Sequence, residues 1–118
     1  MPKRKTSPTV VDLFAGCGGL SLGLENAGFE PVFVNELNAD AMESYLLNRS
    51  HLEHDLRDPR RHAFDIYDIT SNRNRLEDLA SFLKSEHGEI DLVAGGPPCQ
   101  GFSGIGHRRT FTELAKSD

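Results

Sequence analysis

The sequence predicts an α/β domain in which a parallel sheet carries helices on both faces. Two observations lead to this prediction: short apolar runs alternate with helical stretches along the 118 residues, and glycine-rich loops follow the first and the last apolar run. A chain of this length forms one domain at most, and a domain of this size buries roughly two-thirds of the surface that its unfolded chain exposes. One small hydrophobic core is therefore expected.

Each predicted element has its own signal in the sequence. The predicted strands are short apolar runs, and they cover residues 9–14, 31–35, 65–69 and 90–94. The predicted helices cover residues 20–27, 39–48 and 76–86. Gly28 ends the first helix, and Asn38 is a good N-cap for the second. Residues 50–63 are polar, contain Pro59 and follow neither period, so they are expected to form a loop or an insertion.

Composition and charge narrow the class of protein. The net charge of -5 argues against a chain that coats nucleic acid non-specifically, although local basic clusters can still contact phosphate. No apolar stretch approaches the roughly 20 residues needed to cross a bilayer. The basic residues 3–5 are not followed by an apolar region, so residues 1–8 are expected to be a flexible basic tail and not a secretory signal. Two cysteines in glycine-rich loops do not resemble a disulfide framework, which favours a reducing cytoplasm.

Several side chains in the polar segment superficially resemble a metal-binding cluster. They are His51, His54, Asp55, Asp58 and His62. Their spacing fits no known zinc pattern, and they lie in an irregular stretch. We therefore expect them to be solvated surface residues, and no metal is expected.

The first glycine-rich loop is typical of a ligand site. The run DLFAGCGG covers residues 12–19, at the exit of the first strand. In an open parallel sheet, ligands bind outside the carboxyl ends of the strands, and glycines there let backbone amides approach the ligand. The spacing of Gly16, Gly18 and Gly19 is tighter than the dinucleotide pattern GxGxxG, so an adenosyl group with an amino-acid tail fits better than a pyrophosphate. Cys17 is expected to be a small buried side chain in this loop.

Acidic residues follow the next two predicted strands. Glu36 closes the second strand, where a carboxylate can accept hydrogen bonds from ribose hydroxyls. Asp68 closes the third, where it can accept a hydrogen bond from an adenine amino group. Taken singly, each acid is better explained as a strand cap and each glycine as a tight turn. Three such features at three successive strand ends favour a ligand site.

The second glycine-rich loop points to a nucleophile. The run GGPPCQGFS covers residues 95–103, and its glycines and prolines hold Cys99 in a stiff loop after the last predicted strand. A cysteine attacks as its thiolate, and the free thiol has a pKa of about 8.5. The site must therefore favour the thiolate or remove its proton during attack. Together the two loops suggest an enzyme.

These residues resemble the N-terminal part of a DNA (cytosine-5) methyltransferase of the bacterial restriction-modification type. DLFAGCGG at residues 12–19 is similar to the family's first motif, and GGPPCQGFS at residues 95–103 is similar to its catalytic motif. Residues 35–36 and 67–70 fall where the family has its ribose and adenine contacts. The resemblance covers residues 9–111. It implies an incomplete Rossmann-like S-adenosylmethionine-dependent methyltransferase fold, made of the first four parallel strands with their flanking helices.

The resemblance also implies a set of cofactor-binding residues. Phe14 would pack on the adenine of S-adenosylmethionine, Glu36 would hold the ribose and Asp68 the adenine amine. Leu37 stands where many relatives place a tryptophan over the adenine, so some stacking would be lost. The full set that the resemblance implies is Phe14, Ala15, Gly16, Gly18, Gly19, Leu20, Glu36, Leu37, Asp68, Ile69 and Pro97.

The implied reaction takes place on a cytosine that is flipped out of double-stranded DNA. The Cys99 thiolate attacks carbon 6, which makes carbon 5 nucleophilic enough to take the methyl group, and elimination restores the base. The residues expected to contact DNA follow the cysteine. They are Gln100, Ser103, His107, Arg108 and Arg109. Such an enzyme would be cytoplasmic in a prokaryote and associated with DNA.

Family features that lie downstream of the cysteine motif are absent from the 118 residues. They include the Glu-Asn-Val motif, the target-recognition domain and a C-terminal helix. Residues 9–118 are therefore expected to be the N-terminal part of a catalytic domain, split or truncated, nearly inactive without a complementing C-terminal subunit or fragment. Two alternatives stay open: a non-catalytic fragment that binds S-adenosylmethionine or a partner, and a tRNA cytosine-5 methyltransferase.

Overall fold

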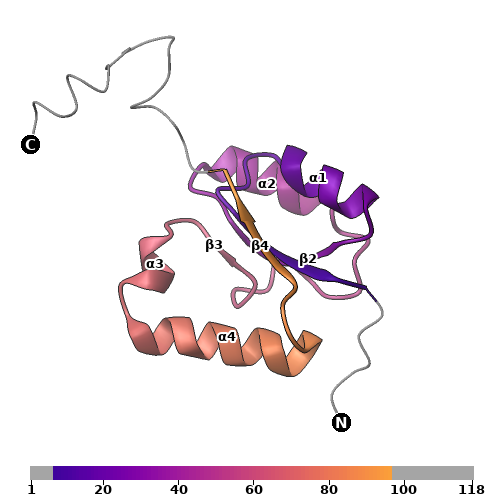
Figure 1. Ribbon diagram of the computed structural model, residues 1–118. Coiled ribbons are helices and arrows are strands. Elements are labelled where there is room, and N and C mark those ends of the chain that lie inside the picture. Colours follow the sequence, from indigo (N-terminus) through magenta and orange to yellow (C-terminus); the bar gives the residue numbers. More distant parts are fainter. Residues whose placement is uncertain (1–6, 97–118) are drawn as a thin grey trace, which may run out of the picture.

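The computed structural model describes residues 7–96, which form one layered α/β unit (Figure 1). Its strands are β1 (Thr9–Leu13), β2 (Glu30–Asn35), β3 (His62–Ala63) and β4 (Leu92–Gly95). Its helices are α1 (Gly19–Asn26), α2 (Ala39–Leu47), α3 (Tyr67–Thr70) and α4 (Arg73–His87). The four strands form one sheet in the order β3-β2-β1-β4, and every pair of neighbours is parallel. The predicted parallel sheet is confirmed.

The sheet has a helical layer on each face. α1 and α2 cover one face, and α4 covers the other (Figure 1). The cluster Ala15, Val34, Met42, Tyr45, Leu46 and Leu56 is buried on the α2 side. The cluster Val32, Phe33, Ile69 and Leu83 is buried on the α4 side. Within residues 7–96, no helix combines the length and the apolar character needed to cross a membrane.

A bulge in β2 decides which side chains reach which face. The register of β1 with β2 runs from Val10 opposite Pro31 to Val11 opposite Phe33, so it skips Val32. Two successive residues, Val32 and Phe33, therefore both join the α4-side core, and alternation resumes at the next residue.

The third strand differs from the prediction. The strand pairing with β2 is His62–Ala63, inside the stretch predicted to be a loop, and the predicted strand over residues 65–69 is wrong. The Asp65 side chain accepts a hydrogen bond from the Tyr67 amide at 2.9 Å, which starts a turn that continues into α3. Ile66 and Ile69 lie three residues apart, as on a helix, and both contact the α4-side core. Tertiary packing therefore favours the helical turn.

Side-chain caps fix two helix starts. Asn38 caps α2 as predicted, since its side-chain oxygen accepts a hydrogen bond from the Ala41 amide at 2.9 Å. The side chain of Asn72 accepts from the Asn74 amide at 2.8 Å, so α4 begins at Arg73, before the predicted start at residue 76.

The polar segment after α2 is held against the sheet. His51 is exposed, as expected, but the side chain of His54 is only 9% exposed and lies 2.7 Å from the Pro31 carbonyl and 3.2 Å from Glu30. His62 Nδ1 lies 2.9 Å from the Leu56 carbonyl. The prediction of a solvated surface is therefore wrong for His54. In the described part of the chain, no three His, Cys, Asp or Glu side chains gather to hold a metal ion.

Candidate functional site

A cavity of about 330 Å³ lies at the carboxyl ends of the strands. Its walls come from the segments that leave β1, β2, β3 and β4, where a doubly wound sheet binds its ligand. It is lined by Phe14, Gly16, Asn35, Glu36, Leu37, Phe64, Asp65, Ile66, Tyr67 and Gly96. Its mouth is apolar, because Leu37 is 72%, Phe64 43% and Tyr67 70% exposed. Exposed rings of this kind around a cavity with two carboxylates suit a planar ligand that carries polar groups.

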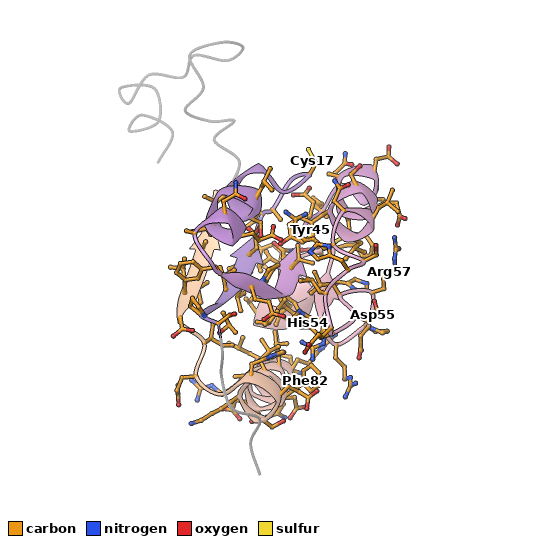
Figure 2. The ribbon with its side chains drawn as sticks, turned by 90° about the vertical axis from the view of Figure 1, so that its right-hand side faces the viewer. Cys17, Tyr45, His54, Asp55, Arg57 and Phe82 are labelled. Atoms are coloured by element: carbon orange, nitrogen blue, oxygen red, sulfur yellow. The ribbon has the colours of Figure 1, made fainter. Side chains whose placement is uncertain are left out.

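The glycine loop after β1 is fixed by contacts with β2 and α2. The Gly16 amide donates to Glu36 Oε1 at 2.8 Å, and Glu36 Oε2 accepts from the Asn38 amide at 2.8 Å. Gly16 has φ +62° and Gly18 φ +103°, conformations that favour glycine. A Cβ on Gly18 would lie 2.7 Å from the Arg49 guanidinium and 2.9 Å from the Tyr45 ring, so a side chain at that position would be strained. Cys17 is exposed at the surface (Figure 2), and its predicted burial is wrong.

The cavity wall that follows β3 contains Asp65, which lies three residues before Asp68, the residue predicted to bind the adenine amine. Asp65 and Ile66 line the cavity directly after the short strand. Both aspartates are exposed, but Asp68 lies in α3 and does not line the cavity, while Ile69 is 8% exposed and belongs to the α4-side core. The sequence contains Asp-Ile twice, at residues 65–66 and 68–69, and the wrong strand prediction pointed to the second copy.

Comparison with known proteins identifies the family. A family model described as C-5 cytosine-specific DNA methylase matches residues 8–116. The chain belongs to this family. It is similar to the Type II methyltransferase M.HindV of Haemophilus influenzae, with 44% identity over 98 residues, which are 83% of this chain and 27% of that protein. It is also similar to M.PspPI of Psychrobacter sp., with 36% identity over 92% of this chain and 21% of that protein. M.HgiGI of Herpetosiphon aurantiacus is 38% identical over 83% of this chain and 64% of its own length.

A solved structure supports the methylase fold. It is described as a DNA modification methyltransferase encoded within an E. coli prophage, and it matches with a TM-score of 0.54 and 34% identity. The match covers 82% of this chain and 24% of that chain. The predicted family and the incomplete Rossmann-like fold are therefore confirmed. The chain spans about a quarter of the length of M.HindV, at 27%.

Some of the predicted cofactor residues of this methylase chain line the cavity and others do not. Phe14, Gly16, Glu36 and Leu37 line it. The residues that do not are Ala15, Gly18, Gly19, Leu20, Asp68 and Ile69. The remaining predicted site residues lie outside the described part of the chain: Pro97, Cys99, Gln100, Ser103, His107, Arg108 and Arg109.

Arg49 backs the glycine loop, although no motif in the sequence pointed to it. It is 5% exposed. Its guanidinium donates to Glu25 at 2.7 Å, to the Tyr45 carbonyl at 3.1 Å and to the Gly18 carbonyl at 3.2 Å. It also lies 3.8 Å above the Tyr45 ring. One buried cation therefore ties the loop to both α1 and α2.

The carboxyl group of Asp12, the first residue of the loop motif, lies in the same buried cluster. Asp12 is fully buried, and neither carboxyl oxygen has a hydrogen-bond partner in the described part of the chain. Burial raises the pKa of Asp12, and the nearby hydroxyls of Ser21 and Tyr45 and the charge of Arg49 offset this only in part. The two hydroxyls lie 2.7 Å apart, so they share a hydrogen bond. The base of the glycine loop is thus polar and buried.

Proposed function

We propose that this chain forms the cofactor-binding part of an enzyme that transfers a methyl group from S-adenosylmethionine to carbon 5 of cytosine in DNA, within a restriction-modification system. The observation that carries this proposal is the cavity at the strand ends, where Phe14, Glu36 and Asp65 come from three successive strand exits. Membership of the methylase family supports the reaction class.

The residues of the cavity fit S-adenosylmethionine. Phe14, Leu37, Phe64 and Tyr67 offer apolar surface for the adenine ring. Glu36 already accepts two backbone hydrogen bonds, and each carboxylate oxygen has a further lone pair for a ribose hydroxyl. The turn formed with the Tyr67 amide orients Asp65, which we assign to the adenine amine in place of Asp68.

The chemistry on the base belongs to Cys99. When bound, the cofactor supplies the methyl group as an electrophile. The Cys99 thiolate adds to carbon 6 of the flipped-out cytosine, so that electron density moves to carbon 5. After methylation a base takes the carbon 5 proton, the electrons of that bond restore the double bond between carbons 5 and 6, and sulfur leaves carbon 6 as the Cys99 thiolate. Gln100, Ser103, His107, Arg108 and Arg109 are proposed to contact DNA. As part of a restriction-modification system, the enzyme is proposed to work in the cytoplasm of a prokaryote.

The rest of a methylase domain is proposed to complete the sheet, either as a later segment or as a complementing chain. β4 ends the sheet order, and Val93 on this strand is 63% exposed. An open strand beside exposed apolar side chains is a surface for further pairing. A monodisperse monomer of this chain in light scattering, unchanged when the complementing part is added, would contradict this assignment.

The cofactor site is tested by calorimetric titration of S-adenosylmethionine into the purified chain and into two matched variants. Asp65→Asn removes a charge from the cavity, whereas Asp68→Asn removes the same charge three residues away. We expect saturable binding that Asp65→Asn weakens about tenfold, because hydrogen bonds to a charged group are roughly twice as strong as neutral ones. Asp68→Asn should leave the affinity within about twofold. Equal effects of the two variants would refute the assignment of Asp65.

Catalysis is tested in the complemented enzyme with a methyl-transfer assay on double-stranded DNA. Cys99→Ser should abolish transfer while cofactor binding persists. Retained transfer by this variant would exclude Cys99 as the nucleophile, and equal transfer to tRNA would exclude DNA as the specific substrate.

A further inference from the structure

We propose that Asn35 is a positioning residue that links the two walls of the cavity and sets the spacing between Phe14 and Asp65. The effect of this link on cofactor binding rests on the proposed function, whereas the hydrogen bonds that form the link belong to the fold itself. Asn35 is the last residue of β2, the strand that lies between β1 and β3, and it is 1% exposed.

The Asn35 amide group bonds to both neighbouring strand exits. Its Oδ1 accepts from the Phe14 amide at 3.1 Å. Its Nδ2 donates to the carbonyl of Ala63 at 3.1 Å and to the carbonyl of Phe64 at 2.9 Å. Its backbone carbonyl accepts from the Ala15 amide at 2.9 Å. One side chain thus satisfies backbone groups on both sides of its own strand.

On the β1 side, these bonds hold an unfavourable backbone conformation. Phe14 has φ +54°, and among residues 7–96 it is the one non-glycine residue with positive φ. Side chains rarely adopt this left-handed region, and such a conformation persists only when its surroundings fix it. The amides of Phe14 and Ala15 both donate to Asn35, which keeps the Phe14 ring at the cavity wall.

On the β3 side, the same amide strengthens a very short strand. β3 has two residues, and its backbone pairing with β2 includes Val34 to Arg61 at 3.0 Å and Glu36 to Ala63 at 3.1 Å. The carbonyls that Asn35 binds belong to the two residues directly before Asp65. A shift of these carbonyls would move Asp65 with them.

Among side chains of this length, asparagine alone meets both demands. It offers one acceptor and two donors, and each has its partner here. Aspartate has the same size and keeps the acceptor for Phe14. Its second oxygen, however, would face the two carbonyls of Ala63 and Phe64 and repel them. Asn35→Asp should therefore release only the β3 wall, and Asn35→Ala should release both walls.

The link between the walls is tested by amide hydrogen exchange on the complete chain. In Asn35→Ala the Phe14 amide should exchange at least about tenfold faster, while the amides of β1 keep their protection. In Asn35→Asp the Phe14 amide should stay protected, and the NMR shifts of residues 63–67 should move. Unchanged exchange at Phe14 in Asn35→Ala would overturn the proposal, whether or not the chain binds S-adenosylmethionine. Should Asn35→Ala fail to fold, Asn35→Asp tests the β3 wall by itself.

The effect on the ligand is tested by calorimetry with S-adenosylmethionine. Asn35→Asp should weaken binding about tenfold, and adding Asp65→Asn to it should cost only about twofold more, because residues that act together are not additive. Leu83→Ala serves as a control for lost stability, since Leu83 lies in the α4-side core. Asn72→Asp controls for added charge, because this variant keeps an acceptor at the cap of α4 and Asn72 does not line the cavity. Both controls should bind with wild-type affinity.

Hydrogen exchange and calorimetry together distinguish the proposed role of Asn35 from the proposed function of the chain. A wild-type chain that does not bind S-adenosylmethionine would count against the proposed function. The hydrogen-exchange experiment would still test the role of Asn35. Full additivity of Asn35→Asp and Asp65→Asn would overturn the coupling, as would an equal loss of affinity in Leu83→Ala.

Discussion

Two buried arginines, one on each face of the sheet, use the same side chain for different purposes. Arg49 lies on the α1–α2 side and is 5% exposed, and Arg61 lies on the α4 side and is 4% exposed. Arg49 donates to the Gly18 carbonyl and to Glu25. Arg61 donates to the Val32 carbonyl at 3.3 Å and packs over the Phe82 ring at 5.0 Å. Figure 2 shows Tyr45, the partner of Arg49, and Phe82, the partner of Arg61, at opposite sides of the sheet.

The difference lies in what each cation holds in place. Arg49 fixes the loop that forms one wall of the cavity, while Arg61 joins the segment before β3 to α4, away from the cavity. Burial also lowers the pKa of Arg61, mainly through lost hydration, and Glu86, which stabilises its charge, is 51% exposed at its side chain. Two equally buried arginines can therefore have different roles, because the role depends on which groups accept their hydrogen bonds.

The largest effect is expected for Arg49→Met. The substitution leaves Glu25 without its buried cation, and breaking one partner of a buried ion pair costs about 3–5 kcal/mol. Urea unfolding should show this loss, and the folded fraction should bind S-adenosylmethionine at least about tenfold more weakly. Wild-type affinity at matched folded fraction would show that the loop does not depend on Arg49.

A smaller effect is expected for Arg61→Met. Its partner Glu86 is half exposed and can be hydrated after the change, so we expect a loss of about 2 kcal/mol. The same urea experiment measures it. The affinity of the folded protein for the cofactor should not change, and a tenfold loss would abolish the distinction between the two arginines.

Tyr45→Phe should cost about 1–2 kcal/mol. The change removes the hydrogen bond with the Ser21 hydroxyl, which is fully buried and would lose its partner. The ring under Arg49 remains. Thermal unfolding measures the difference, and a second variant, Ser21→Ala with Tyr45→Phe, should recover part of the loss. No recovery would mean that the cost comes from packing.

The smallest effect is expected for Asp12→Asn, and its sign depends on pH. Since burial raises the pKa of Asp12, the folded protein keeps a proton that the unfolded chain releases. Stability should therefore fall as pH rises from the ordinary Asp pKa through the raised value. Asp12→Asn should flatten this slope and stabilise the chain by about 1 kcal/mol at neutral pH. Urea midpoints measured from pH 4 to 8 would test it, and an unchanged slope would exclude Asp12 as its source.

Local sequence patterns were sufficient to predict those elements whose signal lies within a few consecutive residues. The apolar run at residues 9–14 and the run PVFVN at residues 31–35 predicted two strands closely, and Asn38 predicted the start of α2. The glycine loop and Glu36 were placed at the cavity from the same patterns. These features depend on short-range backbone chemistry, which a sequence displays directly.

Contacts between distant residues decided the rest. The sequence contains Asp-Ile twice, and either copy could follow the third strand. The pairing of His62–Ala63 with β2 brings Asp65 to the cavity and leaves Asp68 on α3. No local pattern shows the hydrogen bonds of Asn35 and Arg49, since their partners lie up to 31 residues away along the chain. The sequence by itself determined the parallel α/β class, the family and the glycine loop after β1. The tertiary structure decided which carboxylate faces the cavity and which buried polar groups hold its walls, because hydrogen bonds and burial between strands depend on register, and register is a property of the assembled sheet.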